Sequence, residues 1–325
     1  MTLYAIAKAV GGDVYARGRR ANIPAPGHSL ADRSVSLLVA DGRLVIHCFG
    51  AASWQEVRAD LLARGLIDAS GVLVGDGRSA GRVAASPTPG RLERRAFAEA
   101  LWLGSGELHA AAPAGRYCMA RGAPEALGRP WALRSHAAAP VSVYGGGRFT
   151  RPALVCAVRS ADDLLTAVEL TYLTTAGARC AVVRTPRKAI GVLPPGSAVR
   201  LAPAAATLLV AEGVFTTLSA MARFDLPGWA LLSTRNLRRW TPPPGVRRVL
   251  IAADRGADGE ASAATLRRGL LRLGVEAEIR CPPPAFGDWN DWWIAGRDAE
   301  RAGRRSKGPV GCARGQDDPR SGAGA

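Results

Sequence analysis

The sequence predicts an α/β protein whose main sheet is mainly parallel, with helices on both faces. Apolar runs alternate with helical stretches between residues 206 and 294. Helices are expected near residues 214–223 and 259–273, and the apolar runs are ATLLVA, WALLS, RRVLIAA and VEAEIR. Strands that alternate with helices form βαβ units, whose strands run parallel.

Two smaller β-rich regions precede this sheet. Residues 152–185 contain PALVCAV and LTAVELTYL, two strand-like runs joined by a polar turn. Near the start, a short helix is expected to end at Gly11. Residues 36–40 and 43–47 flank an Asp-Gly pair, which is a strong hairpin signal. The sequence therefore predicts a small α+β region in front of the parallel sheet and another β region at the N-terminus.

Composition suggests where these parts begin and end. A Gly/Ser/Pro-rich stretch is expected to be a linker, and a final stretch with almost no large apolar residues is expected to be a disordered basic tail. The predicted parts are an N-terminal domain at 1–68, the linker at 69–95, a helical lead-in with the β-rich region at 96–204, the parallel-sheet domain at 205–295 and the tail at 296–325.

The charge balance points to a polyanionic partner. The 325-residue chain has 43 Lys+Arg against 27 Asp+Glu, a formal net charge of +16. Nucleic acid is the first candidate. Abundant Arg, Ala and Gly also fit a GC-rich coding bias, so charge alone leaves the partner open.

The chain is expected to be cytoplasmic. No apolar run approaches a membrane span, and the start lacks the pattern of a signal peptide, so we expect no membrane partner. The six cysteines contain no Cys-x-x-Cys pair and are expected to be reduced and mostly buried.

Acidic residues follow the predicted strands. Glu212 directly follows ATLLVA, Asp254 directly follows VLIAA, and Asp288 and Asp291 lie in a DWND group after the last strand. Ligands of such sheets bind outside the carboxyl ends of the strands. Carboxylates that converge there repel one another unless a cation such as Mg²⁺ lies between them. Acids at strand ends also cap helices, for which Asp254 and Asp258 are suited, so the spacing leaves both interpretations open.

Other catalytic motifs are missing from the sequence. There is no P-loop, which excludes a helicase-type ATPase in this chain, and no Gly-x-Gly-x-x-Gly follows a strand. His-Glu-x-x-His and Gly-x-Ser-x-Gly are also absent. The three tryptophans at 289, 292 and 293 are expected to cover an edge of the core rather than to stack on bases.

The late motifs resemble a Toprim domain, and more closely the Toprim domain of bacterial and phage DnaG-type primases. Four segments carry this resemblance, in order and spacing: LLVAEGVFTTLSA, ALLSTRNL, VLIAADRGADGEASA and FGDWNDWW. Upstream, PAGRYCMARGAP and RPALVCAVRSADDLLTAVELTYLTTAG are similar to earlier parts of the primase core. The start of the chain is similar to a primase zinc ribbon, so the resemblance covers most of residues 1–294.

The resemblance implies a set of site residues. Glu212 takes the position of the proposed general acid/base beside the metal, and Asp254 takes that of the first metal-binding aspartate. Asp288 matches the late acidic motif, with Asp258 and Asp291 as further candidate ligands. The implied cofactor is Mg²⁺ or Mn²⁺.

Three acid positions of the family are occupied here by other residues, namely Thr216, Gly256 and Asn290. Loss of a ligand or of its hydrogen-bonding partner weakens metal binding or activity by about 10–100-fold. The resemblance therefore leaves open whether catalysis survives in this chain.

The implied zinc ribbon also lacks ligands. Of the four positions only His28 and Cys48 hold a metal-binding residue. Structural zinc needs four ligands, so these two residues are expected to be vestigial and no zinc is expected. We predict instead that packing through Phe49 and Trp54 holds this region.

The function that the resemblance implies is Mg²⁺-dependent synthesis of RNA primers on single-stranded DNA, in phage, plasmid or mobile-element replication. Ribonucleoside triphosphates would be the substrates, and the replicative helicase would be a separate protein. The residues expected to follow the template phosphates are Arg184, Arg187, Lys188 and Arg200. Two alternatives stay open: a Toprim nucleic-acid-binding accessory protein without catalysis, and a Toprim nuclease.

Overall fold

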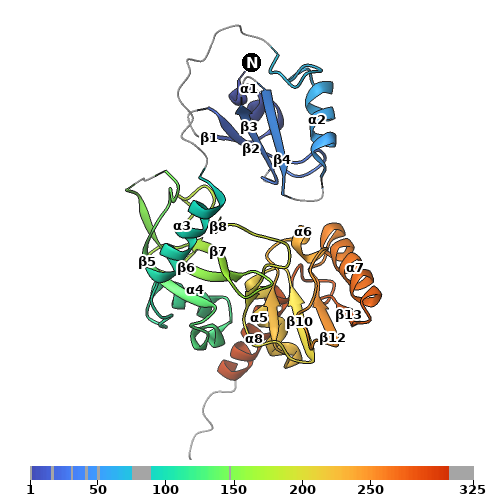
Figure 1. The fold of residues 1–325 in the computed structure, drawn as a ribbon. Coiled ribbons are helices and arrows are strands. Elements are labelled where there is room, and N and C mark those ends of the chain that lie inside the picture. The colour runs from blue at the N-terminus through green and yellow to red at the C-terminus, as the bar shows by residue number, and fades with distance from the viewer. Residues whose placement is uncertain are drawn as a thin grey trace, which may run out of the picture.

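The computed structural model describes residues 2–15, 18–30, 32–40, 43–49, 52–74, 89–145 and 148–306. In this part of the chain the strands form three sheets, each with its own helices (Figure 1). Two sheets have four strands and one has five. No described helix is both long enough and apolar enough to span a membrane.

The N-terminal part is a four-stranded antiparallel sheet in the order β1-β2-β3-β4, flanked by two helices. Its elements are α1 (Leu3–Val10), β1 (Asp13–Tyr15), β2 (Arg20–Ile23), β3 (Val35–Ala40), β4 (Arg43–Cys48) and α2 (Trp54–Ala63). Helix α1 ends at Gly11, whose positive φ of 77° suits glycine. Buried Leu3 and Ile6 of α1 and Leu61 of α2 pack against the sheet. The predicted hairpin of β3 and β4 is confirmed, although its two turn residues lie outside the described residues.

The middle part is an antiparallel sheet in the order β5-β6-β7-β8. Its elements are α3 (Arg91–Leu103), α4 (Pro113–Ala120), the 3₁₀ helix η1 (Pro124–Gly128), β5 (Leu133–Pro140), β6 (Thr150–Arg159), β7 (Leu165–Tyr172) and β8 (Arg187–Gly191). Helix α3 packs across β7 and β8 because Ala98, Leu101 and Trp102 form one apolar face. The two predicted strands are β6 and β7, while β5 and β8 were not identified from the sequence.

The C-terminal part is the predicted α/β sheet, in the order β13-β12-β10-β11-β9. All its strand pairs are parallel except β11 with the edge strand β9. Its elements are β9 (Val199–Arg200), β10 (Thr207–Ala211), α5 (Val214–Phe224), β11 (Gly228–Ala230), α6 (Thr234–Leu237), β12 (Arg248–Ala252), α7 (Ala257–Arg272), β13 (Glu276–Arg280) and α8 (Trp289–Ser306).

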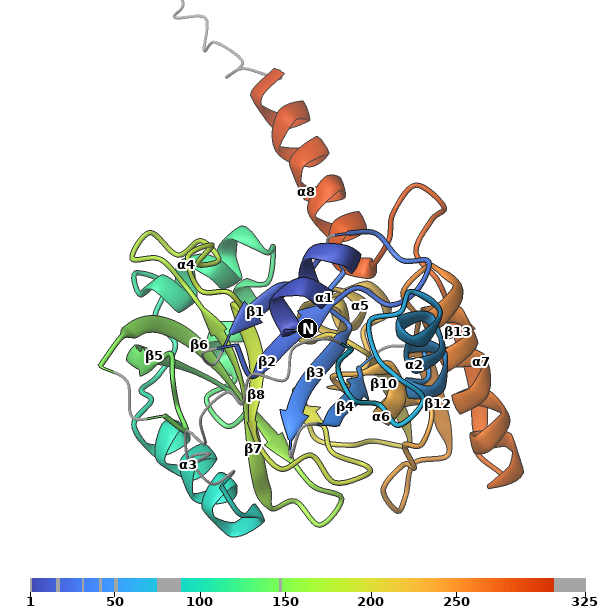
Figure 2. The ribbon, with the colours of Figure 1, turned by 90° about the horizontal axis from the view of Figure 1, so that it is seen from above.

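The last helix corrects one prediction. Helix α8 continues to Ser306 and projects from the body (Figure 2), so the expectation of disorder from residue 296 is wrong for 296–306. The first turn is held by Trp289, which is buried and packs edge-on against Phe224. Trp293 donates to the Gly122 carbonyl at 3.0 Å. These contacts confirm that the tryptophans cover a core edge. The rest of the predicted tail, residues 307–325, lies outside the described residues.

The predicted linker at 69–95 is only partly described. Residues 75–88 lie outside the described residues, and α3 already begins at Arg91. Before the gap, Leu73 forms a β-bridge with Ile67. The five described cysteines are free, and three of them are buried, as expected.

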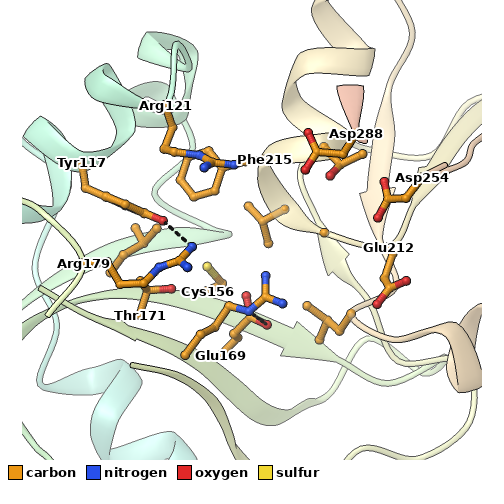
Figure 3. A pocket seen from close by; sticks show the side chains of 16 residues that line it. Tyr117, Arg121, Cys156, Glu169, Thr171, Arg179, Glu212, Phe215, Asp254 and Asp288 are labelled. Atoms are coloured by element: carbon orange, nitrogen blue, oxygen red, sulfur yellow. Dashed lines mark hydrogen bonds and ion pairs between the residues drawn. The ribbon is translucent and has the colours of Figure 1, made fainter. Parts of the chain in front are cut away.

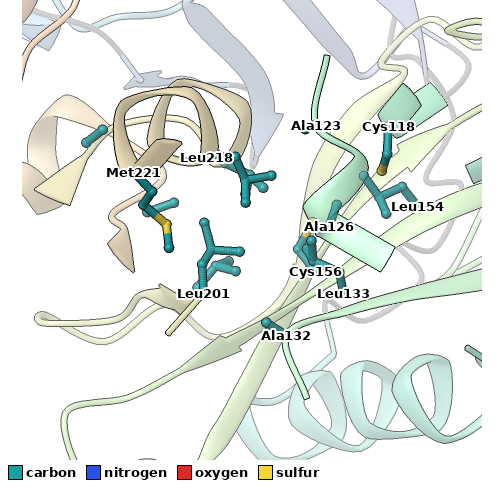
Figure 4. Packing of buried hydrophobic residues seen from close by; sticks show 14 of the residues in the cluster. Cys118, Ala123, Ala126, Ala132, Leu133, Leu154, Cys156, Leu201, Leu218 and Met221 are labelled. Atoms are coloured by element: carbon teal, nitrogen blue, oxygen red, sulfur yellow. The ribbon is translucent and has the colours of Figure 1, made fainter. Parts of the chain in front are cut away.

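One apolar core joins the middle and C-terminal parts. Leu133 and Leu154 of the antiparallel sheet belong to the same buried cluster as Leu218 and Met221 of α5 (Figure 4). A β-bridge between Arg159 and Ala198 connects the two sheets directly. The two parts therefore form a single packed unit, and side chains from both can line one cavity.

Candidate active site

The winding of the chain reverses at β10. The chain passes from β10 through α5 to β11 on one side, and then crosses to β12 on the other side. Such a switch point leaves a crevice at the carboxyl ends of the two flanking strands. Ala211 pairs with Ala252 at that edge. Glu212 and Asp254 therefore leave the sheet from neighbouring strands, as the sequence predicted.

A cavity of about 150 Å³ lies at this edge, between the parallel sheet and the antiparallel sheet. Glu212, Asp254 and Asp288 lie on one side of it, and Arg121 and Arg179 face them from the other (Figure 3). The polar and aromatic side chains that line it are Tyr117, Arg121, Cys156, Glu169, Thr171, Arg179, Arg187, Glu212, Phe215, Thr216, Asp254 and Asp288. The cavity thus combines an acidic edge with a basic wall.

Asp254 combines a carboxylate oxygen without a hydrogen-bond partner and a strongly raised pKa. Its Oδ1 atom is buried and has no hydrogen-bond partner among the described residues. Burial raises the pKa of Asp254 to about 7, with further increases from the negative charges of Glu212 and Asp288. Buried polar atoms nearly always have a partner. A carboxylate that has an oxygen without a hydrogen-bond partner and lies beside other negative charges is suited to bind a cation.

Glu212 lies in a mixed electrostatic environment. Burial raises its pKa, and the guanidinium of Arg187 opposes that increase. Asp258 raises the pKa of Glu212 further, while Arg238 lowers it. A carboxyl group with a raised pKa holds a proton more readily, which suits a general acid or base.

The basic wall comes mainly from the middle part. Arg187 at the start of β8 forms an ion pair of 3.9 Å with Glu169 of β7. Arg179 donates to the Tyr117 hydroxyl at 3.5 Å. Arg121 lies 5.3 Å from the centre of the Phe215 ring. Guanidinium groups aimed into a partly enclosed cavity are typical of phosphate recognition.

Sequence reasoning identified only part of this wall. Arg187 was predicted, whereas Arg121, Arg179 and Glu169 were not. Arg121 lies directly after α4, in the PAGRYCMARGAP segment that resembles primases, which was the available signal. Glu169 reaches the cavity through the pairing of β7 with β6 and β8, which the sequence did not predict in full. Arg179 lies in the connection between β7 and β8, where it forms a β-bridge with Leu173.

The other three predicted basic residues form their contacts outside the cavity. Arg184 stacks over the Tyr15 ring at 3.5 Å, in the N-terminal part. Lys188 donates to the Val141 carbonyl at 2.6 Å. Arg200 pairs with Asp163 at 3.0 Å and lies over the Trp229 ring. None of the three lines the cavity.

The two further candidate ligands are also placed outside the cavity. Asp258, in the first turn of α7, forms an ion pair with Arg238. Asp291 is exposed in the first turn of α8, and its backbone N–H donates to Asp288 Oδ1 at 2.8 Å. Asp288 therefore caps α8 while its carboxylate lines the cavity.

At the three positions where primases of the resembling family have acids, the residues of this chain are buried, set the backbone conformation or form hydrogen bonds. Thr216 is buried in α5. Gly256 precedes α7 with a positive φ of 114°, a backbone conformation that favours glycine. Asn290 is fully buried, and its amide donates to the Arg121 carbonyl at 2.8 Å and to Ser219 Oγ at 2.9 Å.

The N-terminal region is not held by the two aromatic residues named from the sequence. Phe49 is 57% exposed and Trp54 is 53% exposed, so the predicted packing is wrong. The buried apolar residues of α1, α2 and the sheet supply the core instead. His28 is exposed and pairs with Asp32 at 3.3 Å, and Cys48 lies half-buried at the end of β4. The zinc-ribbon likeness of this region stays a prediction.

The residues of the cavity fit one divalent cation. In the part of the chain that the structure describes, no three or more His, Cys, Asp or Glu side chains form a complete metal cage. Mg²⁺ does not require one, because it usually keeps several waters and takes one or two carboxylates besides substrate phosphates. Asp254, with its unpartnered oxygen, and Asp288 supply such a donor set.

These features define an α/β domain with an acidic site at the switch point of its sheet. Residues 207–298 match the Toprim domain family, so this segment is a Toprim domain. Residues 92–201 match a domain of unknown function (DUF7146). A comparison with curated proteins found no match.

Solved primase structures are similar to this chain. The Aquifex aeolicus primase, with its zinc-binding and RNA polymerase domains, is 13% identical, with a TM-score of 0.45 over 94% of this chain and 82% of that one. The RNA polymerase domain of Mycobacterium tuberculosis primase DnaG is 14% identical, with a TM-score of 0.40 over 68% and 89%. The primase fragment of the bacteriophage T7 primase-helicase protein is 11% identical, with a TM-score of 0.38 over 59% and 70%. At these values the similarity by itself assigns no activity.

Proposed function

We propose that this chain is a primase-like nucleotidyltransferase that joins ribonucleotides on single-stranded DNA with Mg²⁺ or Mn²⁺. One observation carries the proposal: the unpartnered Asp254 carboxylate faces a wall of three arginines across a single cavity. Carboxylates beside guanidinium groups serve phosphoryl transfer, where a cation and basic side chains compensate phosphate charge together. The motifs that resemble primases upstream of the Toprim domain favour primer synthesis within this class.

In this reaction the residues of the cavity would have separate roles. Arg121, Arg179 and Arg187 bind phosphate oxygens of the incoming triphosphate and the template. Glu212, whose pKa is raised, accepts the proton from the attacking 3′-hydroxyl. The bond from that oxygen to the α-phosphorus forms as the bond to pyrophosphate breaks. Asp254 and Asp288 would hold the cation, which when bound compensates charge on the phosphate oxygens.

The partners follow from this activity. Single-stranded DNA and ribonucleoside triphosphates would occupy the cavity and its approaches. A replicative helicase would be a further partner. We place the protein in the replication of a phage, plasmid or mobile element in the cytoplasm.

A second candidate is a Toprim nucleic-acid-binding protein without catalysis. The observation that favours it is that the residues at 216, 256 and 290, where the resembling family has acids, are Thr, Gly and Asn here. Such a protein would bind single-stranded DNA through the same basic wall but would form no product.

One assay separates these functions. The full chain and its Glu212→Gln variant are incubated with single-stranded DNA, labelled ribonucleotides and Mg²⁺. Labelled primers that disappear with the variant support primer synthesis. DNA binding without product supports the accessory protein, and shortening of the DNA supports a nuclease that uses the same acids.

A further inference from the structure

One face of α8 holds the backbone of Arg121 and Gly122. Asn290 donates to the Arg121 carbonyl at 2.8 Å, and the indole nitrogen of Trp293 donates to the Gly122 carbonyl at 3.0 Å. The Nη1 atom of Arg297 lies 3.5 Å from the same Gly122 oxygen. Positions 290, 293 and 297 share one face of a helix. A single helix face therefore supplies donors to carbonyls at the end of α4, where helical carbonyls lack partners within their own helix.

Gly122 allows α8 to come this close. Its φ of 69° lies in the left-handed region, which favours glycine. A Cβ atom added at Gly122 would lie 3.3 Å from Cδ1 of Trp293 and 3.6 Å from Cδ of Arg297. The turn after α4 therefore has both the backbone conformation and the space that its contact with α8 requires.

Asn290 also links Arg121 to helix α5. Its side chain is fully buried, and its amide donates a second hydrogen bond to Ser219 Oγ at 2.9 Å. Ser219 lies one helical turn after Phe215 in α5, so the two residues share a face of that helix. The Phe215 ring lies 5.3 Å from the guanidinium carbon of Arg121 at the cavity (Figure 3). The backbone of Arg121 and the ring that supports its side chain are thus connected through Asn290.

The same helix carries an acid of the opposite wall. Asp288 accepts the Asp291 backbone N–H at 2.8 Å at the start of α8, and its side chain lines the cavity. Arg121 comes from the middle part and Asp288 from the C-terminal part, yet α8 contacts the one and begins at the other. Helix α8 therefore fixes the place of the guanidinium relative to the acid. Such placement matters, because a shift of about 1 Å can cost about 100-fold in activity.

We propose that Asn290 and Trp293 are positioning residues of this cavity. Through the backbone of Arg121 and Gly122 they hold the guanidinium of Arg121 across from Asp288, where it binds a polyphosphate group. The buried amide at position 290 thus supports the basic wall of the cavity. The proposal rests on the proposed function only in that the cavity binds phosphate.

The test measures binding of inorganic triphosphate to the full chain, at constant Mg²⁺, by isothermal titration calorimetry. Trp293→Phe keeps an aromatic ring and removes the indole donor, so we expect about fivefold weaker binding, as for residues coupled through a backbone shift. Trp292 is also half-buried but packs against Trp289. Trp292→Phe is therefore the matched control and should change the affinity less than about twofold. The melting temperatures of the two variants show whether they lose similar stability.

A double variant separates positioning from a general loss of stability. Arg121→Gln should weaken triphosphate binding at least about tenfold, because it removes charged hydrogen-bond donors. If Trp293 acts through Arg121, adding Trp293→Phe to Arg121→Gln should cause no further loss, since the effects of coupled residues do not add. The proposal would be overturned by a further loss of about fivefold in the double variant. Unchanged binding in Trp293→Phe, or an equal loss in Trp292→Phe, would overturn it as well.

Primer synthesis is measured separately, so the two proposals can fail independently. A chain that shows the expected coupling but forms no primers would contradict the proposed function and support the positioning role of α8. An unmodified chain that binds no triphosphate would contradict both.

Discussion

Arg187 and Glu169 form an ion pair on adjacent antiparallel strands, with 3.9 Å between Nε and Oε2. The Glu169 side chain is only 12% exposed, and that of Arg187 is 55% exposed. The pair brings a guanidinium from the middle part of the chain to the acids of the Toprim domain. The same arginine lowers the pKa values of Glu169, Glu212 and Asp254 against the effect of burial.

We therefore expect Arg187→Gln to reduce primer synthesis by about 100-fold, because charge-stabilising donors contribute about that much to phosphoryl and acyl transfer. The variant should also lower the melting temperature, since Glu169 then stays buried without a cation beside it. Adding Glu169→Gln should restore the melting temperature but not the activity. Recovery of activity in the double variant would show that Arg187 acts only on stability.

The raised pKa of Asp254 predicts how metal binding depends on pH. A carboxyl group must lose its proton to bind a cation, and that of Asp254 does so at a pKa of about 7. Mn²⁺ affinity should therefore increase about tenfold between pH 6 and pH 8, because the deprotonated fraction rises by that factor. Titrations at constant ionic strength measure this. An affinity that is the same at both pH values would place the cation on other groups.

Replacing Asn290 by an acidic residue should lower the stability of the folded protein. Asn290 is completely buried, and its amide donates two hydrogen bonds, one of them to the Arg121 carbonyl. Asn290→Asp removes both donors and buries a carboxyl group, so we expect about 2–4 kcal/mol lower stability in urea denaturation. Asn290 does not line the cavity, and the variant should gain no metal affinity. Tighter Mn²⁺ binding by this variant would show that position 290 belongs to the metal site.

Single-stranded DNA binding should depend steeply on salt. If the three arginines of the cavity contact three phosphates, the affinity should fall about 20-fold between 50 and 200 mM salt. The Arg179→Gln variant should show a shallower slope than the unmodified chain. Fluorescence anisotropy with a labelled oligonucleotide measures both slopes, and a flat response would exclude a phosphate-based interface.

The strands of the parallel sheet were predicted correctly because apolar runs and helical stretches alternate strongly in this part of the sequence. The strands at 207–211, 248–252 and 276–280 are short apolar or alternating runs between helices, so their type and order followed from the pattern. The positions of Glu212 and Asp254 at the sheet edge followed from the same pattern. Helix α8 was not predicted, and its part from residue 296 was assigned to a disordered tail because these turns carry few apolar residues. Packing of Trp289 and the hydrogen bond of Trp293 hold its start.

The basic wall was harder to predict for a compositional reason. With 40 arginines in the chain, no single one stands out, and local sequence does not tell which reach the cavity. Lys188 and Arg200 lie in basic or strand-like segments but bond to backbone carbonyls. Arg121 reaches the site because α4 packs against the antiparallel sheet, and Arg179 because it forms a β-bridge with Leu173; both are tertiary features.

Template-dependent incorporation of ribonucleotides by the Asp254→Asn variant tests the central claim most directly. With single-stranded DNA, ribonucleoside triphosphates and Mg²⁺, we expect labelled primers from the unmodified chain and from the control Asp162→Asn, which changes an exposed carboxylate outside the cavity. We expect product from Asp254→Asn to fall at least about 100-fold, while DNA binding is retained. Undiminished primer synthesis by Asp254→Asn would contradict the assignment of this cavity as the catalytic site.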